Sequence, residues 1–77
     1  MDASKIIQFL TEQGSISMRV ASKRMGRAQS FLSVVKHNGR IPQANTLAAI
    51  ADVYGYDLLL RNRTDGREVI IDPPTEG

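Results

Sequence analysis

Internal glycines divide this chain into segments that are each long enough for one short helix or one hairpin. They are Gly14, Gly26, Gly39, Gly55 and Gly66. Glycine is a natural stop after a helix because it adopts the left-handed backbone conformation without steric cost. Before each of the first four glycines, apolar residues recur at spacings of three and four, which is the period of a helix. The sequence therefore predicts four short helices and then an element of a different kind.

The expected helices cover about residues 3–13, 17–25, 28–37 and 45–54. Asp2 or Ser4 can cap the first helix and Ser17 the second, because their side chains accept hydrogen bonds from free N–H groups. Ile41–Pro42 predicts a turn before the fourth helix, since the residue before a proline is pushed out of the helical region.

A β-hairpin is expected after the fourth helix. Residues 56–63 and 67–72 are rich in strand-forming side chains and flank Asp65–Gly66. Asp-Gly between two such runs is a strong hairpin signal. Pro73–Pro74 should end the second strand, because proline has no N–H to donate to a sheet. Residues 73–77 are then expected to form a disordered tail.

The two faces of this hairpin are predicted to differ. A two-residue turn at Asp-Gly places Leu60 opposite Ile71 and Arg61 opposite Ile70. One face then carries an apolar row of Leu58, Leu60, Val69 and Ile71. The other face carries Leu59 and Ile70 among polar groups, and these two side chains have no obvious partner within the chain.

Charge is segregated along the chain. Six of the ten basic residues, and none of the eight acidic ones, lie between Ser17 and Arg40, although the whole chain has a formal charge of only +2. The six are Arg19, Lys23, Arg24, Arg27, Lys36 and Arg40. A positive surface attracts polyanions, of which DNA is the commonest. The alternative, from charge alone, is a solvated basic surface without a partner.

The chain offers little for catalysis or metal binding. It has no cysteine and a single histidine, so a disulfide is excluded and one histidine cannot build a zinc site alone. Ser17, Ser30 and Ser33 are nucleophiles in principle, but no paired base supports that chemistry. We therefore expect neither an enzyme nor a cofactor.

No membrane or export signal is visible. No apolar run approaches the roughly 20 residues needed to cross a bilayer. The first residues lack the basic start and the uniformly apolar middle of a signal peptide. We therefore expect a cytoplasmic protein with no membrane partner.

Residues 17–37 have the pattern of a helix-turn-helix unit, in which two short helices are joined by a tight turn with glycine. The turn needs a residue without a side chain, and Gly26 stands there. A small residue must pack against the third helix, and Ser22 lies four positions before the glycine. Leu32 and Val35 supply the apolar anchors for the buried face of the third helix.

The opposite face of the third helix, with its N-terminal end, can enter the major groove of DNA. The positions on this face are Arg27, Gln29, Ser30, Ser33 and Val34. A glutamine can pair with an adenine edge and a serine is a flexible partner. Helix N-termini also favour phosphate through their free N–H groups and their dipole.

These spacings resemble those of a known family, the XRE-type helix-turn-helix regulators of the lambda-repressor and Cro type. The resemblance covers roughly residues 4–60. It rests on a set of spacings taken together, formed by Gly26, Leu32, Val35, Gly39, Pro42, Thr46–Leu47, Ile50–Ala51 and Gly55. Ser22 stands where the family usually has alanine. The stretch from Gly26 to Gly39 is one residue longer than the commonest form.

The resemblance implies an α+β, mainly α fold. A four-helix lambda-repressor-like DNA-binding domain would occupy residues 1–55, and a β-hairpin residues 56–72. The residues implied to face base edges are Gln29, Ser30 and Ser33, with Arg27 and Val34 beside them. The residues implied to lie near phosphate are Ser17, Arg19, Lys36 and Arg40.

By the same resemblance, the chain is a sequence-specific transcriptional regulator, expected to be a repressor of phage, prophage or bacterial origin that binds double-stranded DNA. A lone hairpin exposes its edges, and this, with the unpartnered Leu59 and Ile70, predicts a homodimer formed through the hairpin. One alternative is the antitoxin of a toxin–antitoxin pair, which binds DNA and a protein toxin. Another is a protein-interaction module on the same scaffold, since a fold does not fix a function.

Overall fold

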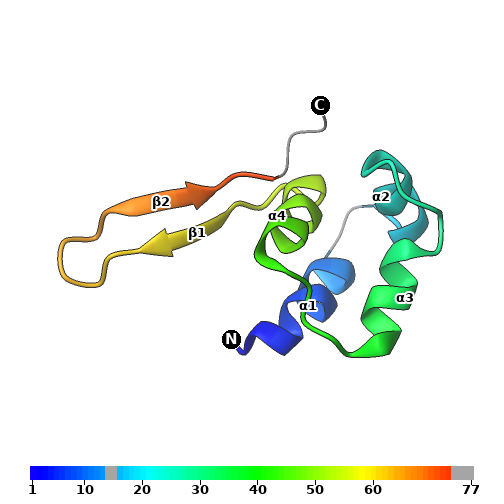
Figure 1. Ribbon diagram of the computed structural model, residues 1–77, viewed down its shortest axis with the longest axis horizontal. Helices are drawn as coiled ribbons and strands as arrows, with labels where there is room; N and C mark the ends of the chain where they lie inside the picture. The colour runs from blue at the N-terminus through cyan, green and yellow to red at the C-terminus, as the bar shows by residue number, and fades with distance from the viewer. Residues whose placement is uncertain (14–15, 74–77) are drawn as a thin grey trace.

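The computed structural model describes residues 1–13 and 16–73, and over these residues the chain is mainly helical with one small sheet (Figure 1). The elements are η1 (a 3₁₀ turn, Ala3–Lys5), α1 (Ile6–Gln13), α2 (Met18–Arg24), α3 (Phe31–Asn38), α4 (Ala44–Val53), β1 (Leu58–Arg61) and β2 (Glu68–Ile71). The predicted α+β, mainly α architecture is confirmed at this level. The expected helix stop at Gly14 and the expected tail beyond Pro73 lie outside the described residues.

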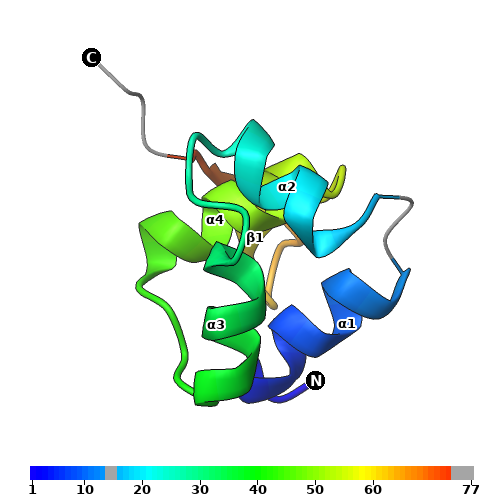
Figure 2. The same cartoon turned by 90° about the vertical axis from the view of Figure 1, so that its right-hand side faces the viewer.

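The four α-helices pack around one apolar core (Figure 2). Its buried side chains are Ile7, Leu10, Ala21, Leu32, Leu47, Ile50 and Ala51. Burying one leucine or isoleucine side chain stabilises a fold by about 1.5–3 kcal/mol. Because every α-helix contributes to this cluster, the core holds α2 and α3 in position against α1 and α4.

Side-chain caps set the starts of the first two helical segments, as the sequence predicts. The Asp2 carboxylate accepts a hydrogen bond from the Ser4 backbone N–H at 3.0 Å. The Ser17 hydroxyl accepts one from the Val20 N–H at 3.2 Å. The bond from the Ser4 N–H also lowers the pKa of the Asp2 carboxyl below its usual value, because a donor favours the charged form.

A Schellman turn at Gly26 ends α2. Gly26 has a φ of +73°. Its N–H donates to the Lys23 carbonyl at 2.9 Å, and the Arg27 N–H donates to the Ser22 carbonyl at 3.0 Å. These two bonds satisfy carbonyl groups that have no partner at the end of a helix.

The third helix begins later than the sequence predicts. We expect it from Ala28 to His37, whereas α3 begins at Phe31 and ends at Asn38. The Phe31 N–H donates to the Ala28 carbonyl at 3.0 Å, which is the spacing of a tight turn. The reason for the late start is the Schellman turn, since the chain must leave that turn before it can enter a new helix.

β1 and β2 form the predicted antiparallel hairpin, but in a different register. The observed pairs are Leu58 with Ile71, Leu59 with Ile70, Leu60 with Val69 and Arg61 with Glu68. The predicted pairing of Leu60 with Ile71 and of Arg61 with Ile70 is therefore wrong. Because side chains alternate with a period of two, this shift by two residues leaves every side chain on its predicted face.

A longer loop explains the shift in register. The Asn62 N–H donates to the Arg67 carbonyl at 2.7 Å, and the Gly66 N–H donates to the Asn62 carbonyl at 2.8 Å. The side-chain oxygen of Asn62 also accepts from the Thr64 N–H at 2.8 Å, a turn that asparagine favours. The loop consequently contains residues 63–66, and the expected Asp-Gly turn is only its second half.

The hairpin projects from the helical body (Figure 1). Leu58 at its base packs against the core, and Ile71 opposite it is half-buried. Further along the same face, Leu60 and Val69 are 65% and 63% exposed. The hairpin thus covers the core only at its base, and it carries exposed apolar side chains on both faces.

Candidate nucleic-acid interface

α2 and α3 pack against each other at one end of the molecule, and the hairpin projects from the other end (Figure 1). Figure 2 looks onto the end that holds α3. The two predicted anchors of α3 point inward, since Leu32 is fully buried and Val35 is half-buried against the core. The outer surface of α3 is therefore exposed.

Ser22 connects the two helices by a hydrogen bond that the sequence analysis missed. Its side chain is fully buried. The hydroxyl donates to the Met18 carbonyl at 2.7 Å and accepts from the Leu32 N–H at 3.0 Å. Leu32 is in the first turn of α3, where backbone N–H groups have no partner within the helix. Ser30, at the N-cap position of α3, makes no side-chain cap bond.

The cap on α3 thus comes from the neighbouring helix, and an alanine at position 22 cannot provide it. The only sequence signal was a serine in place of the alanine that is usual in the resembled family. A serine at a position that must be buried indicates such a cap, because a buried hydroxyl requires a hydrogen-bond partner.

The five residues predicted to contact bases are all exposed, and they lie at and before the start of α3. Arg27, Gln29 and Ser30 precede the helix, whereas Ser33 and Val34 lie within it. The Ser33 hydroxyl donates to the Ser30 carbonyl at 3.0 Å. Ser33 and Val34 line a shallow surface hollow with residues from the last turn of α3.

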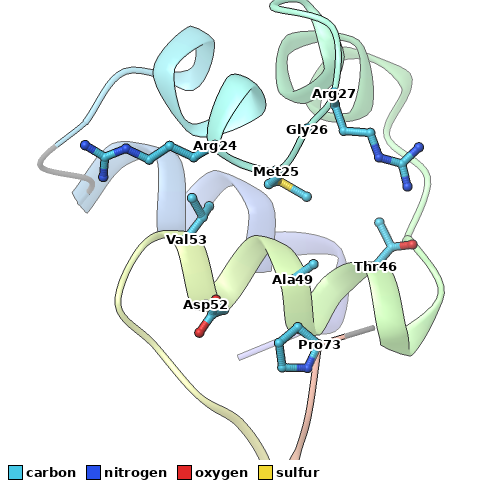
Figure 3. A pocket seen from close by; sticks show the side chains of 9 residues that line it. All are labelled: Arg24, Met25, Gly26, Arg27, Thr46, Ala49, Asp52, Val53 and Pro73. Atoms are coloured by element: carbon cyan, nitrogen blue, oxygen red, sulfur yellow. The ribbon is translucent and has the colours of Figure 1, made fainter. Parts of the chain in front are cut away.

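Arg27 is separate from the other four residues. Its guanidinium lies over the Phe31 ring, with the guanidinium carbon 5.0 Å from the ring centroid, as in a cation–π contact. Arg27 also lines a hollow of about 350 Å³ between the Gly26 turn and α4, where Thr46 is beside it (Figure 3). Arg24 lines the same hollow, but its side chain extends in the opposite direction (Figure 3).

The residues predicted to contact phosphate form two groups. Ser17 and Arg19 are exposed at the start of α2. Lys36 and Arg40 are exposed at the end of α3, where they line one small hollow between α1 and α3. The structure therefore brings Lys36 and Arg40 together and places Ser17 with Arg19 on another helix.

The basic block has no acidic partners within the part of the chain that the structure describes. The ion pairs among residues 1–13 and 16–73 are Arg61 with Glu68 at 3.9 Å and Arg67 with Asp65 at 2.8 Å. Both lie in the hairpin. The exposed lysine and arginine side chains of α2, α3 and the following loop therefore form no ion pair within the described residues.

Two further findings concern the described residues. No three histidine, cysteine, aspartate or glutamate side chains among them come together as a metal ion would require. None of their helices combines the length and the apolar character that a membrane span needs.

Comparisons with known proteins find no relative: no protein-family model, curated protein or solved structure matches this chain. A function can therefore be inferred only from the sequence and from the geometry of α2, α3 and the basic residues around them.

Proposed function

We propose that this chain is a sequence-specific DNA-binding regulator in which α2 and α3 act as a helix-turn-helix unit. The observation that carries the proposal is the arrangement of α3. Its inner side is fixed by Leu32 and by the Ser22 bond. Its outer side is exposed, and the basic side chains around it have no acidic partner in the described chain.

The major groove suits such a helix. It is about 12 Å wide and admits one α-helix, and each base pair presents a distinct pattern of donors and acceptors there. Gln29, Ser30 and Ser33 are the exposed polar side chains at the leading end of α3. Glutamine matches the N6 and N7 edge of adenine. These three residues are the proposed readers of sequence.

Contacts to phosphate would set the position of the helix in the groove. Ser17 and Arg19 are proposed to contact one part of the backbone, and Lys36 and Arg40 another, because the structure places these pairs on different elements. Arg27 is proposed to lie beside the base edges near the start of α3, where Phe31 holds its guanidinium.

The proposed biological role is repression by occupancy of an operator, in a phage, a prophage or a bacterial host. A helix in the major groove next to a promoter excludes other proteins from the same DNA. The chain needs no cofactor for this mechanism.

We further propose that the protein acts as a homodimer joined through the hairpin. The hairpin has only two strands, and such a hairpin is marginally stable in water unless it packs against something. Its face with Leu59 and Ile70 carries both signs of charge, on Arg61 and Glu68. A two-fold copy presents the same groups in reverse and can therefore match this face. α3 lies at the other end of the molecule and stays free for DNA.

The first test is selection of bound sequences from random double-stranded DNA, at two salt concentrations. We expect an enriched palindrome, because a two-fold dimer reads two equal half-sites. Affinity should also fall as salt rises. Binding without an enriched motif would indicate only non-specific attraction of DNA to a basic surface. Absence of binding at both salt concentrations would contradict the proposal.

A pair of glutamine variants tests the proposed orientation. Gln29→Ala should reduce affinity for the selected motif by about fivefold or more, as loss of a bidentate base contact costs about 1–3 kcal/mol. Gln13→Ala is the matched control, since Gln13 ends α1 and has no proposed role at DNA. Equal affinities of the two variants would rule out Gln29 as a reader.

One observation favours a second candidate, the antitoxin of a toxin–antitoxin pair. Leu60 and Val69 remain exposed on the hairpin face opposite Leu59 and Ile70, so a dimer through one face leaves the other uncovered. Co-expression with the product of the adjacent gene tests this candidate. Toxicity that is relieved by the chain, but not by its Leu60→Lys/Val69→Lys variant, would support it.

A further inference from the structure

Val34 is an exposed apolar side chain among polar residues on the surface of α3. It is 55% exposed. The other residues that line the same shallow hollow are Ser33, His37 and Asn38, and all of them are polar. Leu32 and Val35, the helix's other aliphatic residues, turn toward the core.

Val34 is not among the side chains that form the core or pack against it. It lies one turn after Ser30, to whose carbonyl its N–H donates at 2.9 Å. A single exposed valine is common on protein surfaces and by itself needs no explanation. This valine lies between the proposed base readers and the last turn of α3, so it would face the same DNA groove as they do.

Valine is suited to rigid apolar recognition. Its branched side chain has one strongly preferred rotamer in a helix. Both methyl groups are therefore held in a fixed direction before any partner arrives, and little conformational entropy is lost when they are covered. Valine has no hydrogen-bonding group, so it cannot read the donor or acceptor pattern of a base.

The major groove contains one apolar group on the bases, the C5-methyl group of thymine. We propose that Val34 is a specificity-determining residue that selects thymine by packing against this methyl group. The inference rests on the proposed DNA-binding function, and it assigns to Val34 a type of recognition that its polar neighbours cannot perform. One thymine in each half-site is the expected partner.

The test replaces single thymines in the selected motif by deoxyuridine. Deoxyuridine lacks the methyl group and keeps the hydrogen-bonding groups of thymine, so the replacement isolates the apolar contact. At one position in each half-site, the replacement should weaken binding of the unmodified protein by about fourfold, which corresponds to one buried methyl group. Dissociation constants are measured at a fixed salt concentration for every thymine in the motif.

The same series is then measured with Val34→Ala. This variant should bind the thymine motif about fourfold or more weakly, and it should no longer distinguish thymine from deoxyuridine at the sensitive position. Ser33→Ala is the matched control, because it alters the adjacent residue on the same surface and should keep the sensitivity. Circular dichroism of both variants establishes that α3 is intact.

Three results would overturn the inference while leaving the proposed function in place. They are an enriched motif without thymine under α3, equal binding of thymine and deoxyuridine at every position, and a Val34→Ala variant that keeps the full sensitivity. Absence of any DNA binding is a different result and would overturn the proposed function together with the inference.

Discussion

The backbone N–H of Leu32 donates a 3.0 Å hydrogen bond to the side-chain oxygen of Ser22, ten residues earlier on the preceding helix. Both residues are fully buried. The same hydroxyl donates to the Met18 carbonyl, so its donor and one acceptor site are both used. α2 and α3 are therefore joined by a polar contact as well as by the apolar core.

Replacing Ser22 by alanine should destabilise the fold. The variant leaves the buried Leu32 N–H without a partner, which costs about 1–3 kcal/mol. For a domain of this size, each kcal/mol lowers Tm by about 4–8 °C. Thermal unfolding, followed by circular dichroism at one protein concentration, measures the effect. Ser33→Ala is the control, because its hydroxyl is exposed, and it should shift stability by less than about 0.5 kcal/mol. Equal Tm values for the two variants would show that the Ser22 cap contributes nothing.

Replacing Gly26 by alanine should also destabilise the protein, for a conformational reason alone. Gly26 has a φ of +73°, and a Cβ atom added there meets no atom within 4 Å. The expected cost is therefore the penalty of the left-handed conformation, about 1–2 kcal/mol. Gly26→Asn should lose less stability than Gly26→Ala, since asparagine visits this conformation more readily. If thermal unfolding showed the same loss of stability for both variants, the left-handed conformation would not be the cause of that loss.

Removing basic side chains beside α3 should change the salt dependence of DNA binding. Lys36→Ala and Arg40→Ala should each weaken binding to all sequences alike and reduce the slope of log affinity against log salt by about 1. Arg63→Ala is the charge-matched control, since Arg63 is exposed in the hairpin loop. Titrations at four or more salt concentrations give the slopes. A slope that changes as much for Arg63→Ala as for Lys36→Ala would contradict the assigned roles.

Charges placed on the hairpin should separate the proposed dimer. The Leu59→Lys/Ile70→Lys variant is expected to be a folded monomer, because four lysines would meet in a two-fold interface on that face. Leu60→Lys/Val69→Lys alters the opposite face and should leave the dimer intact. Sedimentation velocity distinguishes the two states. If only the second variant is monomeric, the interface uses the other face, and if both remain dimeric, the hairpin is not the interface.

Local chemistry made much of the fold predictable. The caps at Asp2 and Ser17 were predicted from the residue types alone, because a cap needs only a side-chain oxygen a few residues before the N–H it serves. The buried position of Leu32, predicted as an apolar anchor, follows from helical periodicity in the same way. The predicted exposure of the five candidate base-contact residues also agrees with the structure.

Features that depend on the detailed hydrogen bonds of a turn, or on where one element lies against another, were not predictable. The start of α3 depends on how the chain leaves the Gly26 turn. The hairpin register depends on Asn62, whose backbone and side chain close a longer loop than Asp-Gly suggests. The exposure of Leu60 and Val69 depends on where the hairpin ends relative to the helical body.

The sequence by itself therefore determined the number and order of the elements, the faces of the helices and strands, and the block of unopposed positive charge. These properties depend on residue types and spacings within one segment. Only the tertiary structure decided that Ser22 caps α3, that Arg27 lies over Phe31, and that Lys36 and Arg40 share one hollow. Each of these contacts depends on the packing of side chains in three dimensions, which periodicity along a single segment does not specify.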